Sequence, residues 1–345
     1  MKELSKIASQ VQASSTMAID SLAKQMKADG IDVVGFGAGE PDFNTPDEIK
    51  AAGIRAIEEN NTRYTPASGL PGIKKAVCER VKADFHVEYE PSQVMVAAGA
   101  KHCVYVALRA LVNPGDEVIV PAPYWVSYIE LVRMMGGVPV VVTAEESAGF
   151  KITAQQLRDA ITPKTKAMIL NNPSNPTGMV YNGEELKALA DVCVENDLYI
   201  IADEIYSCLL YDGLKFTSVA SLGEEVKKRT ILINGVSKAY AMTGWRIGYA
   251  LAEPEIIKVM SNYLSHCAGS CCTISQKAAE AALSGSQEKI ETMRQAFEER
   301  RNYLVERMNQ VEGVSCIKPE GAFYVMMNME KLVGRTVHGQ VINTC

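Results

Sequence analysis

The chain has 345 residues, of which 47% are hydrophobic and 22% are charged. This size and balance are typical of an ordinary globular protein with one large or two moderate domains, and they exclude disordered and fibrous classes. The formal net charge is −6 and the basic residues are scattered, so the sequence predicts neither a nucleic-acid partner nor a membrane partner.

We predict no signal peptide and no membrane-spanning segment, because neither the N-terminus nor any later window is apolar for long enough. A cytoplasmic protein acting on small molecules is expected. The nine cysteines form no CxxC pair, and several lie in apolar runs, which predicts reduced, buried thiols and no metal site. They are Cys78, Cys103, Cys193, Cys208, Cys267, Cys271, Cys272, Cys316 and Cys345.

Short apolar runs alternate with helical segments between residues 93 and 210. The runs cover 94–98, 117–120, 138–142, 167–170 and 198–202. Helices are expected from about residues 100, 124 and 154, and between the last two runs. This alternation predicts an α/β fold with a mostly parallel central sheet and helices on both faces. Such a sheet binds its ligand at the carboxyl ends of its strands.

Two more strands are predicted at 230–236 and 245–252. The segment between them is too short for a crossover helix, so we expect antiparallel neighbours at one edge of the sheet. A long amphipathic helix over 286–310 then leads to a smaller α+β unit, with strands near 313–317 and 322–327.

Polar side chains follow two of the predicted strands. A buried carboxylate is costly unless it is paired, so a cation or a strong donor should face Asp203; a structural ion pair is the alternative. The loop NNPSNPTG has two Asn-Pro steps that stiffen it, and it projects the amide of Asn175. An ordinary turn is the alternative there.

Glycine marks two places where the backbone is expected to approach a ligand. Gly99 lies at the turn of the strand-to-helix junction AAGAKH, where the N–H groups of Ala100 and Lys101 are free to bind a phosphate. Many such junctions bind nothing. Gly39 lies in GFGAGE, but Pro41 and the lack of a following helix argue against a dinucleotide loop.

Each of these features lies at the carboxyl end of a predicted strand, as does Trp125, whose alternative is a core position. The segment GVSKAYAMTGWRIGY adds an amine nucleophile, Lys238. The combination fits pyridoxal phosphate, whose aldehyde needs a lysine, whose ring nitrogen needs a carboxylate and whose phosphate needs a helix start with an arginine. The set is Lys238, Asp203, Asn175, Tyr206, Trp125, Gly99 to Lys101, Ser237 and Arg246.

These motifs resemble those of a known family. SKAYAMTGWRIGY is similar to the cofactor-lysine motif of class I pyridoxal-phosphate-dependent aminotransferases, and NPSNPTG, ADEIY, PAPYW and GAGEPDFNTP resemble its other motifs in the same order. The match runs from about residue 30 to about 328 and is closest to the bacterial aspartate aminotransferase branch. It implies a fold-type I transferase with a large cofactor-binding domain at 43–290 and a small domain at 1–42 and 291–345.

The resemblance also implies roles around the cofactor ring. Lys238 would form the internal aldimine and shuttle a proton, and Asp203 would pair with the ring nitrogen. Tyr206 and Asn175 would bond the ring hydroxyl oxygen, which tunes the pKa of the Schiff base. Trp125 would stack on the ring.

For the phosphate, the resemblance implies a cradle made by Gly99, Ala100, Lys101, Ser237 and Arg246. Tyr64 would reach this cradle from a second subunit, so a homodimer with shared active sites is implied.

For the substrate, Gly39, Trp125 and Asn175 match positions near the α-carboxylate, and Lys101 matches a lysine near the distal carboxylate. A dicarboxylic amino acid such as aspartate would then be the donor and 2-oxoglutarate the acceptor, in a ping-pong exchange.

The C-terminus departs from the family. GAFYVMMN (321–328) matches the start of the small-domain sheet, but no residue matches the arginine that grips the α-carboxylate, and Arg335 lies too early for it. We therefore expect the resemblance to end near residues 328–340, in a chain that binds cofactor but transaminates weakly. The alternatives are an aminotransferase or lyase for aromatic or neutral amino acids, and a cofactor-binding protein without catalysis.

Overall fold

The computed structural model describes residues 2–13, 15–37, 39–337 and 339–343. Its strands are β1 Val94–Ala97, β2 Glu117–Ala122, β3 Val138–Thr143, β4 Thr165–Asn171, β5 Tyr199–Asp203, β6 Thr230–Gly235, β7 Gly248–Leu251, β8 Ser315–Cys316, β9 Met327–Asn328, β10 Thr336–Val337 and β11 Gln340–Val341. Its α-helices are α1 Lys6–Gln10, α2 Ser15–Ala28, α3 Asp47–Glu58, α4 Pro71–Phe85, α5 Ala100–Leu111, α6 Ser127–Met134, α7 Ala154–Ala160, α8 Gly183–Glu195, α9 Glu224–Arg229, α10 Pro254–Cys267, α11 Thr273–Ser284 and α12 Glu288–Asn309. Short 3₁₀ helices are η1 Pro91–Gln93, η2 Glu146–Ala148, η3 Val219–Ser221, η4 Thr243–Trp245 and η5 Glu330–Leu332.

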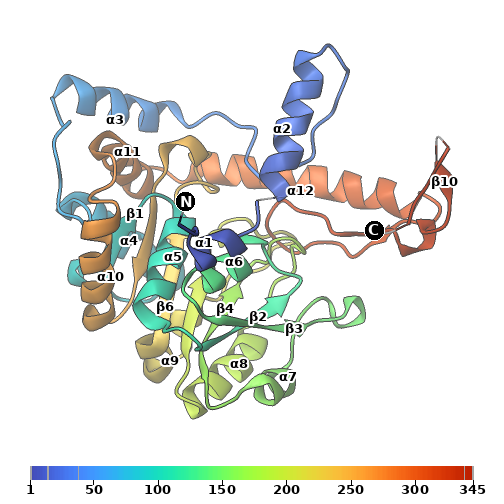
Figure 1. Ribbon diagram of the computed structural model, residues 1–345. Coiled ribbons are helices and arrows are strands. Elements are labelled where there is room, and N and C mark those ends of the chain that lie inside the picture. The colour runs from blue at the N-terminus through green and yellow to red at the C-terminus, as the bar shows by residue number, and fades with distance from the viewer. Residues whose placement is uncertain (1, 14, 38, 338, 344–345) are drawn as a thin grey trace.

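A seven-stranded sheet lies at the centre, in the order β1-β7-β6-β5-β4-β2-β3 (Figure 1). The strands from β3 to β6 pair in parallel, which confirms the predicted α/β sheet. β7 pairs antiparallel with β6, as predicted, but its place at the edge is wrong, because β7 also pairs with β1. Every residue of β7 is buried, as expected of a strand paired on both sides.

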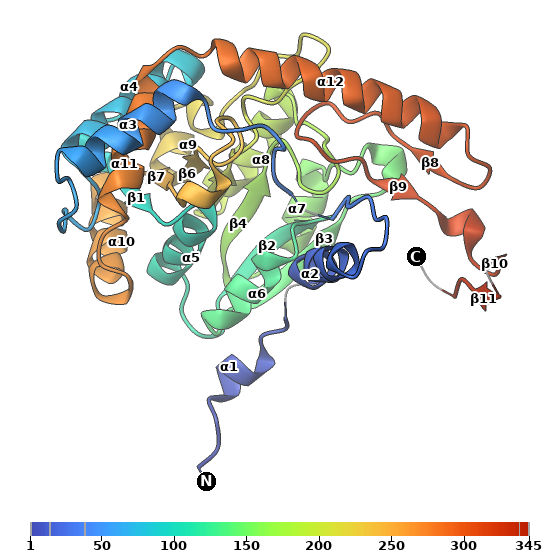
Figure 2. The same cartoon turned by 90° about the horizontal axis from the view of Figure 1, so that it is seen from above.

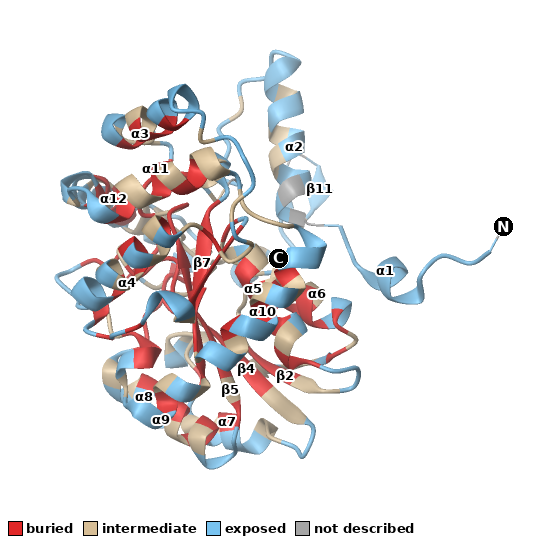
Figure 3. Cartoon of the chain, turned by 90° about the vertical axis from the view of Figure 1, so that its left-hand side faces the viewer, coloured by how far each residue is buried: buried red, intermediate tan, exposed pale blue. Residues whose placement is uncertain are grey.

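The strand side chains alternate between two faces of the sheet. Ile169 and Ile201 pack with α5, α6 and α10, whereas Met168 and Ile200 pack with α7, α8 and α9. This two-residue period requires a layer of helices on each face. Helices α4 and α11 cover the β1–β7 end. Figure 3 shows the buried strands between helices whose outer faces are exposed.

The segments at both ends of the chain lie outside this layered body. Helices α1 and α2 project from it and are mostly exposed (Figures 1–3). The strand predicted near 313–317 is present as β8, which pairs antiparallel with β9. The strand predicted near 322–327 is displaced towards the C-terminus, because β9 begins only at Met327, and each of the two strands has two residues. Within the described ranges, no helix is both long and apolar enough to cross a membrane.

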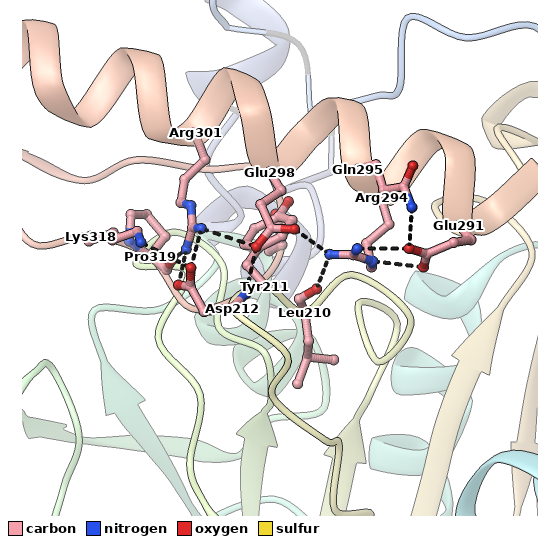
Figure 4. Close-up of polar contacts among 11 residues, drawn as sticks. Leu210, Tyr211, Asp212, Glu291, Arg294, Gln295, Glu298, Arg301, Lys318 and Pro319 are labelled. Carbon is pink, nitrogen blue, oxygen red and sulfur yellow. Dashed lines mark hydrogen bonds and ion pairs between the residues drawn. The ribbon is translucent and has the colours of Figure 1, made fainter.

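Helix α12, predicted over 286–310, is fixed to the loop after β5 by a row of ion pairs and hydrogen bonds (Figure 4). Arg294 donates to the carbonyl of Leu210 at 3.1 Å and pairs with Glu298 at 2.7 Å. Arg301 donates to both carboxylate oxygens of Asp212, at 2.7 and 3.0 Å. These contacts set the direction in which the chain leaves the sheet.

Replacing Arg301 by Met is expected to lower the free energy of unfolding by about 2–3 kcal/mol. The Arg301 side chain is 4% exposed, and it also donates to the carbonyl of Pro319 at 2.7 Å, so the substitution leaves buried acceptors unpaired. Asp212 is half exposed and keeps Lys318 at 3.0 Å, which limits the loss. Urea unfolding followed by circular dichroism measures the change.

The neighbouring Arg300 provides a matched control. Its ion pair with Asp42 spans 2.8 Å, but the two side chains are 52% and 66% exposed. Arg300→Met is therefore expected to change stability by less than about 1 kcal/mol. Equal losses in the Arg300 and Arg301 variants would contradict the importance of the buried pair.

Candidate active site

The carboxyl ends of β1 and β6 lie beside the start of β7, the antiparallel strand between them. Gly248 begins β7 and lies opposite both Ala97 of β1 and Gly235 of β6. A Cβ on Gly248 would lie 2.3 Å from the backbone nitrogen of Ala100, so only glycine allows this approach. Because β7 is antiparallel, its start meets the carboxyl ends of β1 and β6, and the segments leaving all three strands gather there.

The N-terminus of α5 faces an arginine at this point. Gly99 caps the helix with φ +89°, and a Cβ there would lie 2.5 Å from Nη2 of Arg246. The guanidinium is held by donation to the carbonyls of Thr243 at 2.9 Å and Ala98 at 3.1 Å. The free N–H groups of Ala100 and Lys101 and a fixed cation together form a cradle suited to an anion.

Ser237 follows β6, which ends beside this cradle, and its side chain is buried. The backbone around it is fixed, since the N–H of Met242 donates to the Ser237 carbonyl at 3.1 Å. The predicted phosphate residues therefore occupy the segments that leave β1 and β6 and enter β7.

Asp203 ends β5 and is buried. Its Oδ2 accepts a hydrogen bond from the Tyr128 hydroxyl at 2.7 Å, and its Oδ1 accepts one from the N–H of Ile205 at 3.3 Å. Burial raises the pKa of this carboxyl, whereas the two donors and the charge of Lys238 lower it. The strong donor that the sequence required is therefore a hydroxyl, and a cationic group placed here would gain an anionic partner.

Burial raises the pKa of the Tyr206 hydroxyl well above its usual value, and the nearby Asn175 side chain lowers it in part. Asn175 is positioned by Asn171, whose Oδ1 accepts its N–H at 2.7 Å and whose Nδ2 donates to the carbonyl of Asp203 at 2.9 Å. This chain of hydrogen bonds fixes the NPSNPTG loop to the end of β5. The loop is thus more than a plain turn.

Lys238 has the properties of a nucleophilic amine. Its Nζ donates to the carbonyl of Gly39 and lies 5.6 Å from the ring centroid of Phe323. Burial lowers the pKa of this amine to about 8. The neutral, attacking form is therefore a much larger fraction near neutral pH than in an amine of ordinary pKa.

Trp125 and Lys101 are adjacent. The Lys101 ammonium lies 4.7 Å from the ring centroid of Trp125, and this ring contacts Tyr128 edge-on at 5.4 Å. The helix predicted from residue 124 begins instead at Ser127, because a turn closed by the Tyr128 N–H on the Trp125 carbonyl (3.0 Å) precedes it. This turn presents the indole beside the other site residues.

Tyr64 does not join this group. Tyr64 is fully exposed, so its side chain packs against no described residue of its own protomer. The backbone nearby is anchored, since the N–H of Thr65 donates to Ser270 at 3.4 Å. Arg335 does not join the group either. It forms an ion pair with Glu312 on the surface, at 3.0 Å.

Two tyrosines of the site were not predicted from the sequence. Tyr128 lies among apolar residues of α6 and is typical of a core position. Tyr324 lies in GAFYVMMN, a segment whose sequence indicated only the start of the small-domain sheet. Tyr324 bonds the Tyr206 hydroxyl at 2.7 Å. The one available signal was that a buried tyrosine needs a partner for its hydroxyl.

Glu204 points away from the site into a buried position beside η3. Its Oε1 accepts hydrogen bonds from Ser218 at 3.0 Å and from the N–H of Val219 at 2.9 Å, and Oε2 has no partner among the described residues. Burial raises the pKa of this carboxyl to about 8. Because the pKa of this carboxyl is higher in the folded than in the unfolded protein, the group favours folding fully when the pH is below its pKa in the unfolded protein. Its contribution to the free energy of unfolding is lost as the pH rises towards 8.

Glu204→Gln is therefore expected to flatten the pH dependence of stability. The amide keeps the Oε1 acceptor but cannot ionise, so the variant should match the wild type near pH 4.5 and exceed its stability by a few kcal/mol above pH 8. Urea unfolding across this range measures the difference. Exposed Glu224→Gln is the control, and parallel pH curves for wild type and Glu204→Gln would contradict the prediction.

The eight described cysteines are free, and Cys345 lies outside the described residues. The expectation that they are buried is wrong for Cys267 and Cys272, which are exposed because they lie at helix ends facing solvent. No group of three or more potential metal ligands occurs in the described part of the chain.

The fold places a buried carboxylate, a buried amine and an anion cradle at one end of the sheet, an arrangement suited to a group-transfer enzyme. Residues 31–341 match the family model "Aminotransferase class I and II". The chain belongs to this family, whose enzymes work with pyridoxal phosphate. It is an aminotransferase.

Three of the similar proteins are aspartate aminotransferases by name. The aspartate aminotransferase of Geobacillus stearothermophilus is 51% identical over 94% of this chain and 83% of its own length. The crystal structure of the Rhizobium meliloti enzyme superposes with a TM-score of 0.95 at 39% identity, covering 100% of this chain and 86% of that one. The Thermus thermophilus enzyme with maleate gives a TM-score of 0.92 at 40% identity, covering 96% and 86%.

Proposed function

We propose that this aminotransferase uses pyridoxal phosphate to move the amino group of aspartate to 2-oxoglutarate in a ping-pong exchange. The observation that carries the proposal is the convergence of a buried carboxylate, an amine of lowered pKa and an anion cradle at one end of the sheet. The names of its relatives support the choice of aspartate.

The residues present fit the cofactor. Asp203 is buried and bonded only to neutral donors among the described residues, so it suits a cationic ring nitrogen. We assign the phosphate to the N–H groups of Ala100 and Lys101, which directly follow Gly99, and to the side chains of Ser237 and Arg246. The bound cofactor supplies an electron-withdrawing ring that stabilises negative charge at the substrate Cα.

The chain's own groups then position the reactants and move the proton. Lys238 Nζ would react with the cofactor aldehyde as the free amine, with loss of water, and once the substrate amine had displaced it, it would carry the Cα proton as a general base and acid. Tyr206 and Asn175 would donate to the ring hydroxyl oxygen, and Trp125 would cover the ring face. Burial excludes water from these contacts and strengthens each of them.

Lys101 favours a dicarboxylic substrate. Its ammonium over Trp125 is a cation beside the position assigned to the ring, so it can pair with a distal carboxylate while Gly39 and Asn175 contact the α-carboxylate. One of the similar enzymes is described with maleate, which is itself a dicarboxylate. An aromatic or neutral amino acid would leave this cation unpaired.

A homodimer with shared sites is part of the proposal. Tyr64 is fully exposed in its own protomer, and this fits a side chain that completes the phosphate site of a second copy. We also keep the division into a large domain at 43–290 and a small domain at 1–42 and 291–345. The free cysteines favour a reducing compartment, and we propose the cytoplasm.

One experiment tests the substrate. Protein loaded with pyridoxal phosphate is mixed with L-aspartate, L-alanine or L-phenylalanine, and the visible absorbance reports conversion to pyridoxamine phosphate. We expect aspartate to convert it fastest. Lys101→Met should reduce the rate with aspartate about 10-fold or more, because a charged hydrogen bond is lost, and should change the rate with alanine little. Conversion that is as fast with phenylalanine favours the aromatic or neutral alternative, and a bound cofactor that no amino acid converts indicates a binding protein without catalysis.

A further inference from the structure

The roles above leave Tyr324 without a function, although it lies at the centre of the site. Its hydroxyl is 2.7 Å from that of Tyr206, and the two rings meet edge-on at 5.6 Å. The same hydroxyl lies 2.7 Å from where a Cβ would stand on Gly39. Tyr324 thus contacts both the phenol assigned to the cofactor and the backbone assigned to the substrate.

The direction of the Tyr206–Tyr324 hydrogen bond follows from the number of protons. Tyr206 has a single hydroxyl proton, and in the proposed function this proton is donated to the cofactor. Tyr324 must then donate to the Tyr206 oxygen. Burial raises the pKa of Tyr324 to about 12, so its hydroxyl keeps its proton over the working range. Donation to a phenol oxygen makes that phenol a stronger donor in turn.

We propose that Tyr324 is a positioning residue that strengthens Tyr206 as a donor to the cofactor and holds the Gly39 backbone against the site. The inference rests on the proposed function. Among charged groups, Asp203 on β5 acts on both hydroxyls of the pair. The neighbouring amine of Lys238 is in turn surrounded by Glu40, Arg246, Asp203 and Lys101.

The test compares wild type and Tyr324→Phe, both loaded with pyridoxal phosphate, in a pH titration of the visible absorbance without substrate. A weaker donor stabilises the ring-oxygen anion less, so the titration midpoint of the lysine-bound cofactor should rise by a few tenths to about one pH unit. A residue that only fills space would not move this midpoint.

Tyr263→Phe is the matched control, because Tyr263 forms a similar hydroxyl pair with Tyr105 at 3.0 Å that lies outside the site. Its midpoint should equal that of the wild type. An unmoved midpoint in Tyr324→Phe overturns this inference alone. A wild type that takes up no cofactor overturns the proposed function and this inference with it.

A double-mutant cycle tests the contact with Gly39 in the cofactor-free protein. Gly39→Ala brings its Cβ to 2.7 Å from the hydroxyl but 3.6 Å from the nearest ring carbons, so removing the hydroxyl relieves the clash. Gly39→Ala should therefore lower the melting temperature less in the Tyr324→Phe background than in wild type. Equal losses in the two backgrounds would overturn the contact.

Discussion

Lys238→Ala is expected to remove the covalent attachment of pyridoxal phosphate and to lower turnover with aspartate by at least about 10³-fold. The side chain is the candidate nucleophile and the candidate proton carrier, and alanine can do neither. Cofactor should still bind without a covalent link, since Asp203 and the cradle at Arg246 remain. Visible absorbance and steady-state assays measure the two losses.

The same variant should fold at least as well as the wild type. Burial lowers the pKa of Lys238 to about 8, which means that holding its charge in the fold is unfavourable. Exposed Lys215→Ala provides the control for general effects of losing a lysine. Full activity in Lys238→Ala, or equal losses in the Lys215 and Lys238 variants, would contradict the assigned role.

Asp203→Asn should lower turnover about 10²-fold or more while leaving the fold intact. The neutral amide cannot keep a proton on the ring nitrogen, so the ring withdraws electrons less strongly. It also places an N–H₂ group opposite either the Tyr128 hydroxyl or the Ile205 N–H, both of which donate to the carboxylate. Single-turnover kinetics with aspartate separate this effect from binding.

Glu204→Gln is the matched control for Asp203→Asn. Both residues lie at the end of β5, and both substitutions replace a buried carboxyl by an amide. Glu204 faces Ser218 and Val219 instead of the site, so its variant should keep nearly full turnover. Similar losses in both variants would indicate that the strand end, and not a contact between Asp203 and the cofactor, is responsible.

The parallel part of the sheet could be predicted because its strands are short apolar runs between amphipathic helices. The position of Asp203 at the end of a buried strand could also be predicted, since a polar group there breaks the local pattern. The roles of Asp203 and Lys238 stay predictions. The position of β7 could not be predicted, because it depends on Gly248 packing against Ala100 and Gly235, a contact between distant segments.

The residues that support the site were harder to find. Tyr128 and Tyr324 lie in apolar surroundings and read as core, and only the fold brings their hydroxyls to Asp203 and Tyr206. The turn before Ser127 likewise depends on a backbone hydrogen bond that the sequence does not reveal. Tyr64 remains a prediction for a second copy of the chain.

The most direct test of the account is to identify the lysine that binds the cofactor. The protein is incubated with pyridoxal phosphate and reduced with borohydride, which makes the link permanent, and the modified peptide is mapped by mass spectrometry. We predict a single adduct on Lys238, formed more readily as pH rises through about 8 because the free amine reacts. An adduct on another lysine, or none, would contradict the assignment of the active site.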